Sequence, residues 1–192
     1  MSVVNIEDQS LEDLTSELDG TRRRLRQEAA TEIARRAKEG DPNDLFDYAG
    51  DIIDGLERPE AQTRWELLDA LTQMAKVDPG CIEEAFEGAE MSLFDEDSSI
   101  VRLAAFRFLA TWGASSPDRS AKVWKILDEA VQCYHGDPEY RDMLDSLRKF
   151  AEGDISDLVA EALRARVSFD AQSSQGYIKA YSKEIIEVLD RR

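Results

Sequence analysis

A spacing of about 38 residues recurs along the chain, and it constrains the fold more than any other feature of the sequence. Three dipeptides that end in proline follow one another at spacings of 37 and 38 residues: Asp41-Pro42, Asp78-Pro79 and Ser116-Pro117. Asp154 lies a further 38 residues after Ser116. An Asp or Ser in front of a helix, with proline as its first residue, is a helix start signal. The sequence therefore predicts one structural unit that is repeated along the chain.

A second series of residues keeps the same register. Five basic residues, here called the basic ladder, follow one another at spacings of 38 or 39 residues: Arg26, Arg64, Arg102, Arg141 and Lys179. Apolar residues stand three and seven positions after most of them, which places those side chains on one helix face. We expect the ladder to be structural, with each cation tying its helix start to acids of the preceding turn or the neighbouring unit. The alternative is a site for an acidic ligand.

Two helices fit into each unit. The first helices are expected over about 10–18, 42–56, 79–93, 117–134 and 155–167, and the second helices over about 21–38, 59–77, 97–112, 137–151 and 174–190. The longest expected loop covers residues 168–174, and no apolar alternation typical of strands is found. The predicted fold is an all-α, right-handed solenoid of about five helix pairs. Residues 10–192 would form a single domain, with residues 1–9 disordered.

The segment "SSIVRLAAFRFLATWG" has a distinctive pattern, with a Val-Arg pair, small and apolar residues at helical spacing, and a final glycine. Its pattern positions are Val101, Arg102, Ala105, Leu109, Trp112 and Gly113. This segment resembles the second helix of a HEAT repeat. The first unit matches the same pattern with Leu25, Arg26, Ala29 and Ile33, and the second with Arg64, Leu67, Leu71 and Met74. The resemblance covers residues 10–190. It implies a curved α-solenoid that binds another protein on its concave side, and it implies no reaction.

The charge of the chain disfavours nucleic acid as a partner. Its 192 residues include 41 Asp and Glu against 24 Lys and Arg, a formal net charge of -17, whereas phosphate binding needs clustered cations. The exception is the stretch 21–38, which carries a net charge of +5 and includes Arg22, Arg23 and Arg24. That stretch is interpreted as a solvated face, or alternatively as a contact with an acidic partner. No apolar run approaches the roughly 20 residues of a membrane span, so we expect a cytoplasmic protein.

No arrangement of residues indicates catalysis. His135 is the only histidine, and the two cysteines, Cys81 and Cys133, lie 52 residues apart without metal-ligand or redox spacing. Both cysteines are expected to be small buried residues of a reducing compartment. No Ser/His/Asp or Cys/His arrangement and no glycine-rich phosphate loop is present. We therefore expect no catalytic residue, no metal, no cofactor and no enzyme activity.

The expected function is that of a scaffold, adaptor or accessory protein that binds another protein through the concave side of the second helices. The expected contact residues are Trp65, Asp69, Gln73, Leu103, Arg107, Arg35, Asp142 and Lys149. Trp65 is the strongest of them because aromatic anchors are enriched at binding hot spots, although packing against the adjacent unit would also explain it. The mixed charge of the set suits a protein partner. The alternative function is that of a lyase-like or chaperone-like accessory protein that handles a small-molecule cofactor. The sequence leaves the partner and the oligomeric state open.

Overall fold

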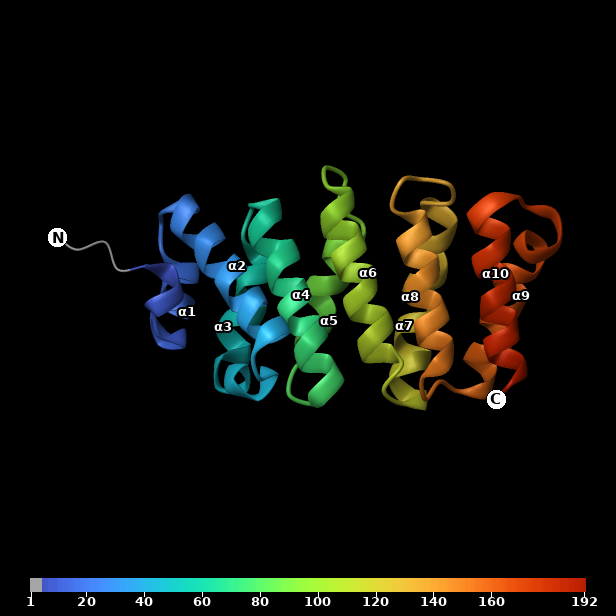
Figure 1. Cartoon of the computed structure of the whole chain (residues 1–192), viewed down its shortest axis with the longest axis horizontal. Coiled ribbons are helices and arrows are strands. Elements are labelled where there is room, and N and C mark those ends of the chain that lie inside the picture. Colours follow the sequence, from blue (N-terminus) through green and yellow to red (C-terminus); the bar gives the residue numbers. More distant parts are fainter. Residues whose placement is uncertain (1–4) are drawn as a thin grey trace. The chain divides into compact units, whose positions relative to one another are not determined.

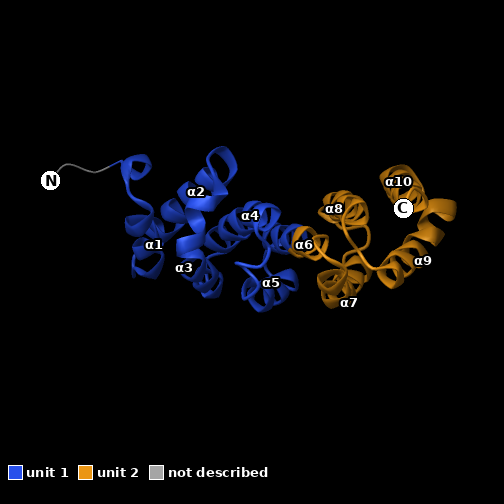
Figure 2. Cartoon of the chain, turned by 90° about the horizontal axis from the view of Figure 1, so that it is seen from below, with its two compact units in different colours: residues 1–108 blue, residues 109–192 orange. Residues whose placement is uncertain are grey.

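The structure is a computed structural model that describes residues 5–192. In this part of the chain it contains ten α-helices, three 3-10 helices and no strand (Figure 1). No helix in these residues is both long and apolar enough to cross a membrane. The order of the elements gives five successive helix pairs, so the predicted all-α repeat fold is confirmed. The chain divides into two compact units, residues 1–108 and 109–192 (Figure 2).

The first unit holds three helix pairs, the last of which ends beyond it. Its helices are α1 (Leu11–Asp19), α2 (Arg23–Glu39), α3 (Ala49–Asp54), α4 (Ala61–Val77), α5 (Ala85–Leu93) and the start of α6 (Ser99–Gly113). Three 3-10 helices complete it: η1 (Ile6–Asp8), η2 (Pro42–Tyr48) and η3 (Gly55–Glu57). The second helices α2 and α4 pack against each other, and the first helices α1, α3 and α5 lie in a separate layer (Figure 2). Leu14, Ile33, Ile52, Leu67 and Leu71 are fully buried between the layers.

The second unit holds the end of α6 and the last two helix pairs. Its helices are α7 (Pro117–Cys133), α8 (Tyr140–Glu152), α9 (Asp157–Ser173) and α10 (Gly176–Asp190). Helix α10 packs against both α8 and α9. Gly113 ends α6 at a close approach, because a Cβ there would lie 2.3 Å from Cγ2 of Val123. The final glycine of the repeat pattern is thus required by packing.

The predicted start signals are confirmed at two junctions and corrected at two others. Asp41 caps η2 by accepting a hydrogen bond from the Asn43 amide at 3.0 Å, with Pro42 as the first residue of that 3-10 helix. Ser116 caps α7 by accepting a hydrogen bond from the Arg119 amide at 3.2 Å, with Pro117 as the first helical residue. Asp154 is not the start of the last pair, because Ser156 caps α9 instead. Asp78 does not start a helix either. Its carboxylate accepts from the Gly80 and Cys81 amides, which makes a turn, and α5 begins only at Ala85.

Two predicted segments differ from the structure in their secondary structure. The helix expected over 42–56 is divided into η2, α3 and η3, since Gly50 and Gly55 lower its helix propensity. The loop expected over 168–174 is wrong, because α9 continues to Ser173. The buried stripe of α9 extends through Val167 to Ala171, and this burial favours the extra turns. The expected burial of the cysteines is also wrong, since Cys81 and Cys133 are both exposed.

The beginning of the chain differs from the expected disorder over residues 1–9. Residues 1–4 lie outside the described residues. Beyond them, η1 forms a 3-10 turn, and Arg36 donates hydrogen bonds to the carbonyls of Glu7 at 3.1 Å and Gln9 at 2.8 Å. The side chain of Arg36 therefore holds residues 7–9 against α2. The single domain over 10–192 stays a prediction.

Candidate binding surface

The basic ladder makes internal contacts in both units, as its structural interpretation requires. In the first unit, Arg26 reaches from α2 to α4, where it forms a buried ion pair with Glu60 and donates to the Gly20 carbonyl at 2.6 Å. This hydrogen bond from Arg26 lowers the pKa of Glu60 below its ordinary value. A buried guanidinium with a matched carboxylate fixes the register of two adjacent helix pairs.

The other members of the ladder make equivalent contacts. Arg64 pairs with Asp95 at 2.7 Å, and Arg102 donates to the Asp95 carbonyl at 2.8 Å. Burial raises the pKa of Asp95, but the hydrogen bond and charge of Arg64, together with the amides of Ser98 and Asp97, outweigh burial and leave that pKa below its usual value. In the second unit, Lys179 donates to the Gln172 carbonyl at 3.0 Å. These contacts tie helix starts to the preceding loop or the next helix pair.

Arg141 differs from the rest of the ladder because it is exposed. Its guanidinium carbon lies 5.9 Å from the centre of the Tyr177 ring, which places a cation of α8 over an aromatic ring of α10. The contact joins successive second helices, so Arg141 also connects two helix pairs.

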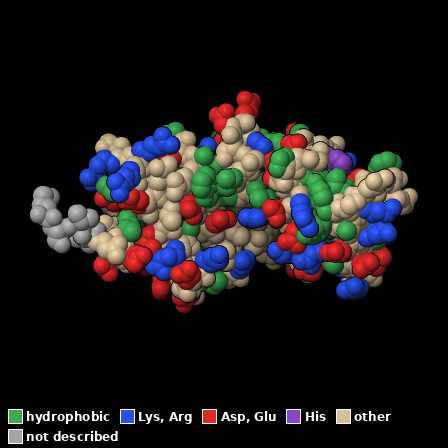
Figure 3. All heavy atoms as spheres, turned by 45° about the horizontal axis from the view of Figure 1, so that its top comes forward, with side chains coloured by type: hydrophobic (Ala, Val, Ile, Leu, Met, Phe, Trp, Pro, Cys, Tyr) green, Lys and Arg blue, Asp and Glu red, His purple; other side chains and the backbone are tan. Residues whose placement is uncertain are grey.

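Helix α4 carries the central part of the expected binding surface. Trp65, Asp69 and Gln73 follow one another at four-residue spacing, share one helix face and are each half-buried. Leu103 and Arg107 have the same spacing on α6 and are also half-buried. We name this set of five residues the second-helix surface. Hydrophobic side chains lie between acidic and basic ones on the face seen in Figure 3, so this face of the protein is mixed in character.

Asp69 is the electrostatic centre of the second-helix surface. Burial raises the pKa of Asp69, although the positive charges of Arg107, Lys38 and Lys76 partly oppose that shift. Within residues 5–192, the Asp69 carboxylate forms no hydrogen bond or ion pair. A partly desolvated carboxylate without a donor has unused capacity to accept hydrogen bonds, so a ligand that brings an N–H group would be favoured here.

The remaining three expected contact residues are not brought into this set. Arg35 is exposed on α2, where it pairs with Glu32 at 2.7 Å and Glu39 at 2.9 Å. Asp142 and Lys149 belong to the second unit, and Lys149 pairs with Asp145 at 2.7 Å. Trp65, Asp69 and Gln73 share one face of α4, and the charge of Arg107 acts on Asp69, while the placing of all eight residues on one concave face stays a prediction.

Sequence reasoning missed Lys38 and Lys76 as charged neighbours of Asp69. Lys38 lies in the last turn of α2 and Lys76 in the last turn of α4, where cations are common because they interact favourably with the helix dipole. Their positions at the helix ends explain their presence without any ligand. The one signal in the sequence was that each lysine comes directly after the last buried residue of its helix.

The basic stretch of α2 is largely paired with acids of its own surroundings. Arg24 contacts Glu28 at 2.6 Å, and Arg36 contacts the buried Glu32 at 2.7 Å. Arg22 lies 3.8 Å from Glu17. The solvated-face interpretation of this stretch therefore accounts for these arginines without an acidic partner.

His135 lies in the loop between α7 and α8 and contacts the last helix pair. Its Nε2 atom lies 3.1 Å from Oδ2 of Asp170, and its ring centre lies 4.8 Å from that of Tyr140. Burial raises the pKa of Tyr140, and the nearby Asp170 adds to that shift. These contacts connect the loop after α7 to α9, which is a structural use of the histidine.

Comparison with known proteins identifies the fold. No family model matches the sequence, and no curated protein matches it significantly. Solved structures of engineered repeat proteins do match. The designed armadillo repeat protein YIII(Dq.V1)4CPAF in complex with the peptide (KR)4 has a TM-score of 0.76 and 15% identity, covering 93% of this chain and 81% of that one. A computationally designed armadillo repeat protein for modular peptide recognition has a TM-score of 0.73 at 15% identity, covering 93% and 81% of the two chains.

A third match is an engineered protein, structural genomics target OR329, with a TM-score of 0.72 and 17% identity over 94% of this chain and 79% of that one. At such identities the likeness concerns the fold alone. Together with the five helix pairs, it defines the chain as an all-α helical-repeat solenoid.

Proposed function

We propose that this protein is a non-catalytic interaction scaffold that binds a peptide segment of another protein across the second-helix surface. The assignment of the repeats to the HEAT type and a cytoplasmic location belong to the same proposal. The HEAT type rests on the pattern around Arg102.

One observation carries the proposal: a half-buried carboxylate without a hydrogen-bond donor lies one helical turn from a half-buried tryptophan. Trp65 offers a large flat area for a partner side chain, and Asp69 offers an acceptor for a partner N–H group. Leu103 adds apolar area from the next second helix. Rigid aromatic area next to a hydrogen-bonding group is typical of the centre of a protein interface.

The structural neighbours support a peptide as the ligand class. One of them is a designed armadillo repeat protein in complex with the peptide (KR)4, and another is designed for modular peptide recognition. Repeat solenoids present successive helices at a regular spacing, and an extended peptide can follow such a series. A scaffold of this kind needs no catalytic group.

The test begins with affinity purification of partners from the native cell, followed by binding measurements with the purified partner. We expect Trp65→Ala and Asp69→Ala each to weaken binding by about tenfold or more, as for hot-spot residues. Lys125→Ala, an exposed change on α7, is the control and should leave the affinity unchanged. If both variants keep the fold by circular dichroism and bind like the wild type, the second-helix surface is not the binding site.

A further inference from the structure

Two runs of the chain contain many acids and no base. Residues 39–57 hold seven Asp and Glu and residues 78–97 hold eight, without a single Lys or Arg in either run. Both runs supply the first-helix layer of the first unit, on η2, α3, η3 and α5. Their charge is therefore concentrated on elements that do not form the second-helix surface.

The first run places its carboxylates on one outward face. Asp44, Asp47, Asp51 and Asp54 follow at spacings of three and four residues and are all exposed. The opposite face carries the buried Leu45, Ala49 and Ile52. Ahead of and within α5, three further acids are exposed: Glu83, Glu84 and Glu87. Within residues 5–192, none of these seven carboxylates, here called the acidic stripes, forms an ion pair.

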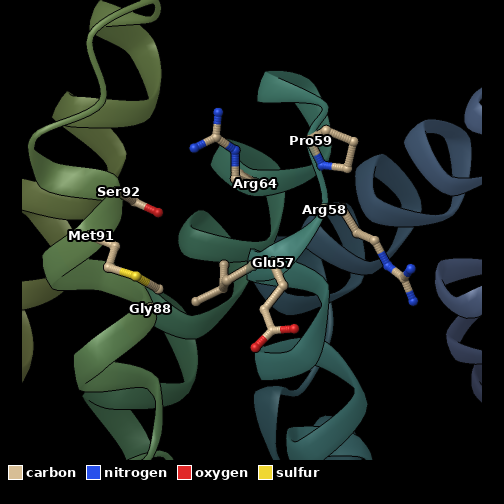
Figure 4. Close-up of a pocket in the computed structure, with 8 residues that line it drawn as sticks. Glu57, Arg58, Pro59, Arg64, Gly88, Met91 and Ser92 are labelled. Carbon is tan, nitrogen blue, oxygen red and sulfur yellow. The ribbon is translucent and has the colours of Figure 1, made fainter.

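A pocket of about 430 Å³ opens between η3, which directly follows the first acidic stripe, and α5, which begins within the second (Figure 4). Leu56 of η3 and Gly88 of α5 form its apolar part, together with Pro59. Met91 lines it from α5 and is 69% exposed, although it is a large apolar side chain. The pocket thus combines apolar area from η3 and α5 with the charged side chains of Glu57, Arg58 and Arg64.

Ser92 gives the pocket a polar group that lacks a partner. The residue is 2% exposed, and its hydroxyl points from α5 toward the pocket (Figure 4). In the described part of the chain this hydroxyl forms no hydrogen bond. The hydroxyl is therefore available to a polar group of a ligand that enters the pocket.

The two arginines that line the pocket have their charges paired through a terminal nitrogen, while the buried Nε of each has no hydrogen-bond partner within residues 5–192 and could donate to a main-chain carbonyl of a peptide. Arg58 pairs with Asp19 at 2.5 Å, and Arg64 pairs with Asp95 at 2.7 Å. The guanidinium of Arg58 points away from the other labelled side chains (Figure 4). Glu57 also lines the pocket, is exposed and adds a negative charge there.

We propose that the acidic stripes and this pocket form a second docking surface, which binds a positively charged peptide segment bearing one apolar anchor side chain. The cations of the segment would pair with the acidic stripes, since a dense group of like charges attracts opposite charge over about a Debye length. The anchor would bury its apolar area against Leu56 and Met91, whose flexible thioether adapts to different shapes. The Ser92 hydroxyl would bond a polar group of the peptide main chain.

The experiment uses two fluorescein-labelled peptides, KRKRLKRKR and KRKRGKRKR, and measures fluorescence anisotropy with the full chain at low salt. The leucine peptide should bind about tenfold more tightly than the glycine peptide, because one leucine side chain becomes buried. Met91→Asp should abolish the preference for the leucine peptide, although the added negative charge should favour the binding of both cationic peptides. Met91→Leu should preserve the preference.

A charge variant tests the acidic stripes separately. Neutralising Asp44, Asp47, Asp51 and Asp54 to Asn should weaken both peptides equally, by about tenfold. The matched control neutralises to Asn or Gln four exposed acids of the second unit that likewise form no ion pair within residues 5–192: Glu129, Asp137, Asp154 and Glu161. This control has the same net charge and should have a much smaller effect on binding. Circular dichroism shows whether each variant keeps its fold.

Three results would overturn the proposal. The first is an equal loss of affinity in the control, which would mean that only net charge matters. The second is a leucine preference that survives Met91→Asp, or peptide binding that is lost in Trp65→Ala, since either places the peptide elsewhere. The third is self-association of the wild type by sedimentation velocity that the Asn variant abolishes. That result would assign the acidic stripes to a second copy of the chain.

Discussion

At the scale of single residues, Asp69 links stability to the proposed binding surface. Burial raises its pKa in the folded protein, so the folded state holds the proton more tightly than the unfolded state does. The sign follows from linkage: the ionised carboxylate costs stability at neutral pH. This cost is absent below the ordinary pKa of an aspartate and develops as the pH rises through the raised value.

We therefore predict that Asp69→Asn increases the free energy of unfolding at pH 7 by about 0.5 kcal/mol. The amide removes the charge and retains the shape, and urea denaturation measures the change. The gain should shrink as the pH is lowered toward 4, where the wild-type carboxyl begins to take up its proton. Asp54→Asn, an exposed acid of the acidic stripes, is the control for the loss of one negative charge. A loss of stability in Asp69→Asn would contradict the prediction and would indicate a stabilising contact of the carboxylate.

At the scale of elements, the second helices could be predicted well because two independent patterns mark them. The basic ladder and the buried stripe behind it share one register, and both are confirmed in α2, α4 and α6. The first helices of the second and third pairs could not be predicted as well. Turn signals compete there with the helical pattern, so Asp78 uses its carboxylate in a turn, and Gly55 stands where α3 gives way to η3.

The candidate site was predictable only in part. Helix periodicity is sufficient to place Trp65, Asp69 and Gln73 on one face, because the residues belong to one element. The pocket beside Met91 was not predictable, since it depends on how closely η3 approaches α5. The missing hydrogen bond of Ser92 has the same origin, because no local pattern reports which donors reach a buried hydroxyl. Sequence reasoning could thus predict single helices and their register, but not the contacts between elements.

The start of α9 gives a prediction at the scale of elements. Ser156→Ala should lower the free energy of unfolding by about 1 kcal/mol, because the hydroxyl satisfies the Val159 amide in the first turn. Asp154→Ala should be nearly neutral, since Asp154 is exposed and its hydrogen bond to the Ala114 carbonyl uses the backbone amide. Urea denaturation compares the two variants. Equal effects would contradict the assignment of Ser156 as the cap.

At the scale of the whole molecule, charge is distributed unevenly between the two units. Residues 1–108 contain 26 acids and 12 bases, a net charge of -14, whereas residues 109–192 contain 15 acids and 12 bases, a net charge of -3. Much of the excess in the first unit belongs to the acidic stripes, which lack internal partners. Folding brings these carboxylates together, so their repulsion opposes the folded state.

This imbalance predicts that salt stabilises the protein. Repulsion between exposed like charges is screened as the Debye length falls, whereas buried pairs such as Arg26 with Glu60 are screened much less. Raising sodium chloride from about 20 mM to about 500 mM should therefore raise Tm, measured by circular dichroism, by about 3 °C or more. The variant with Asn at 44, 47, 51 and 54 should have a higher Tm at low salt and a smaller response to salt. A Tm that is unchanged or falls with salt would show that attractive surface pairs outweigh the repulsion. Repulsion among the acidic stripes would then not be the main electrostatic cost of folding, although their lack of ion pairs implies that it is.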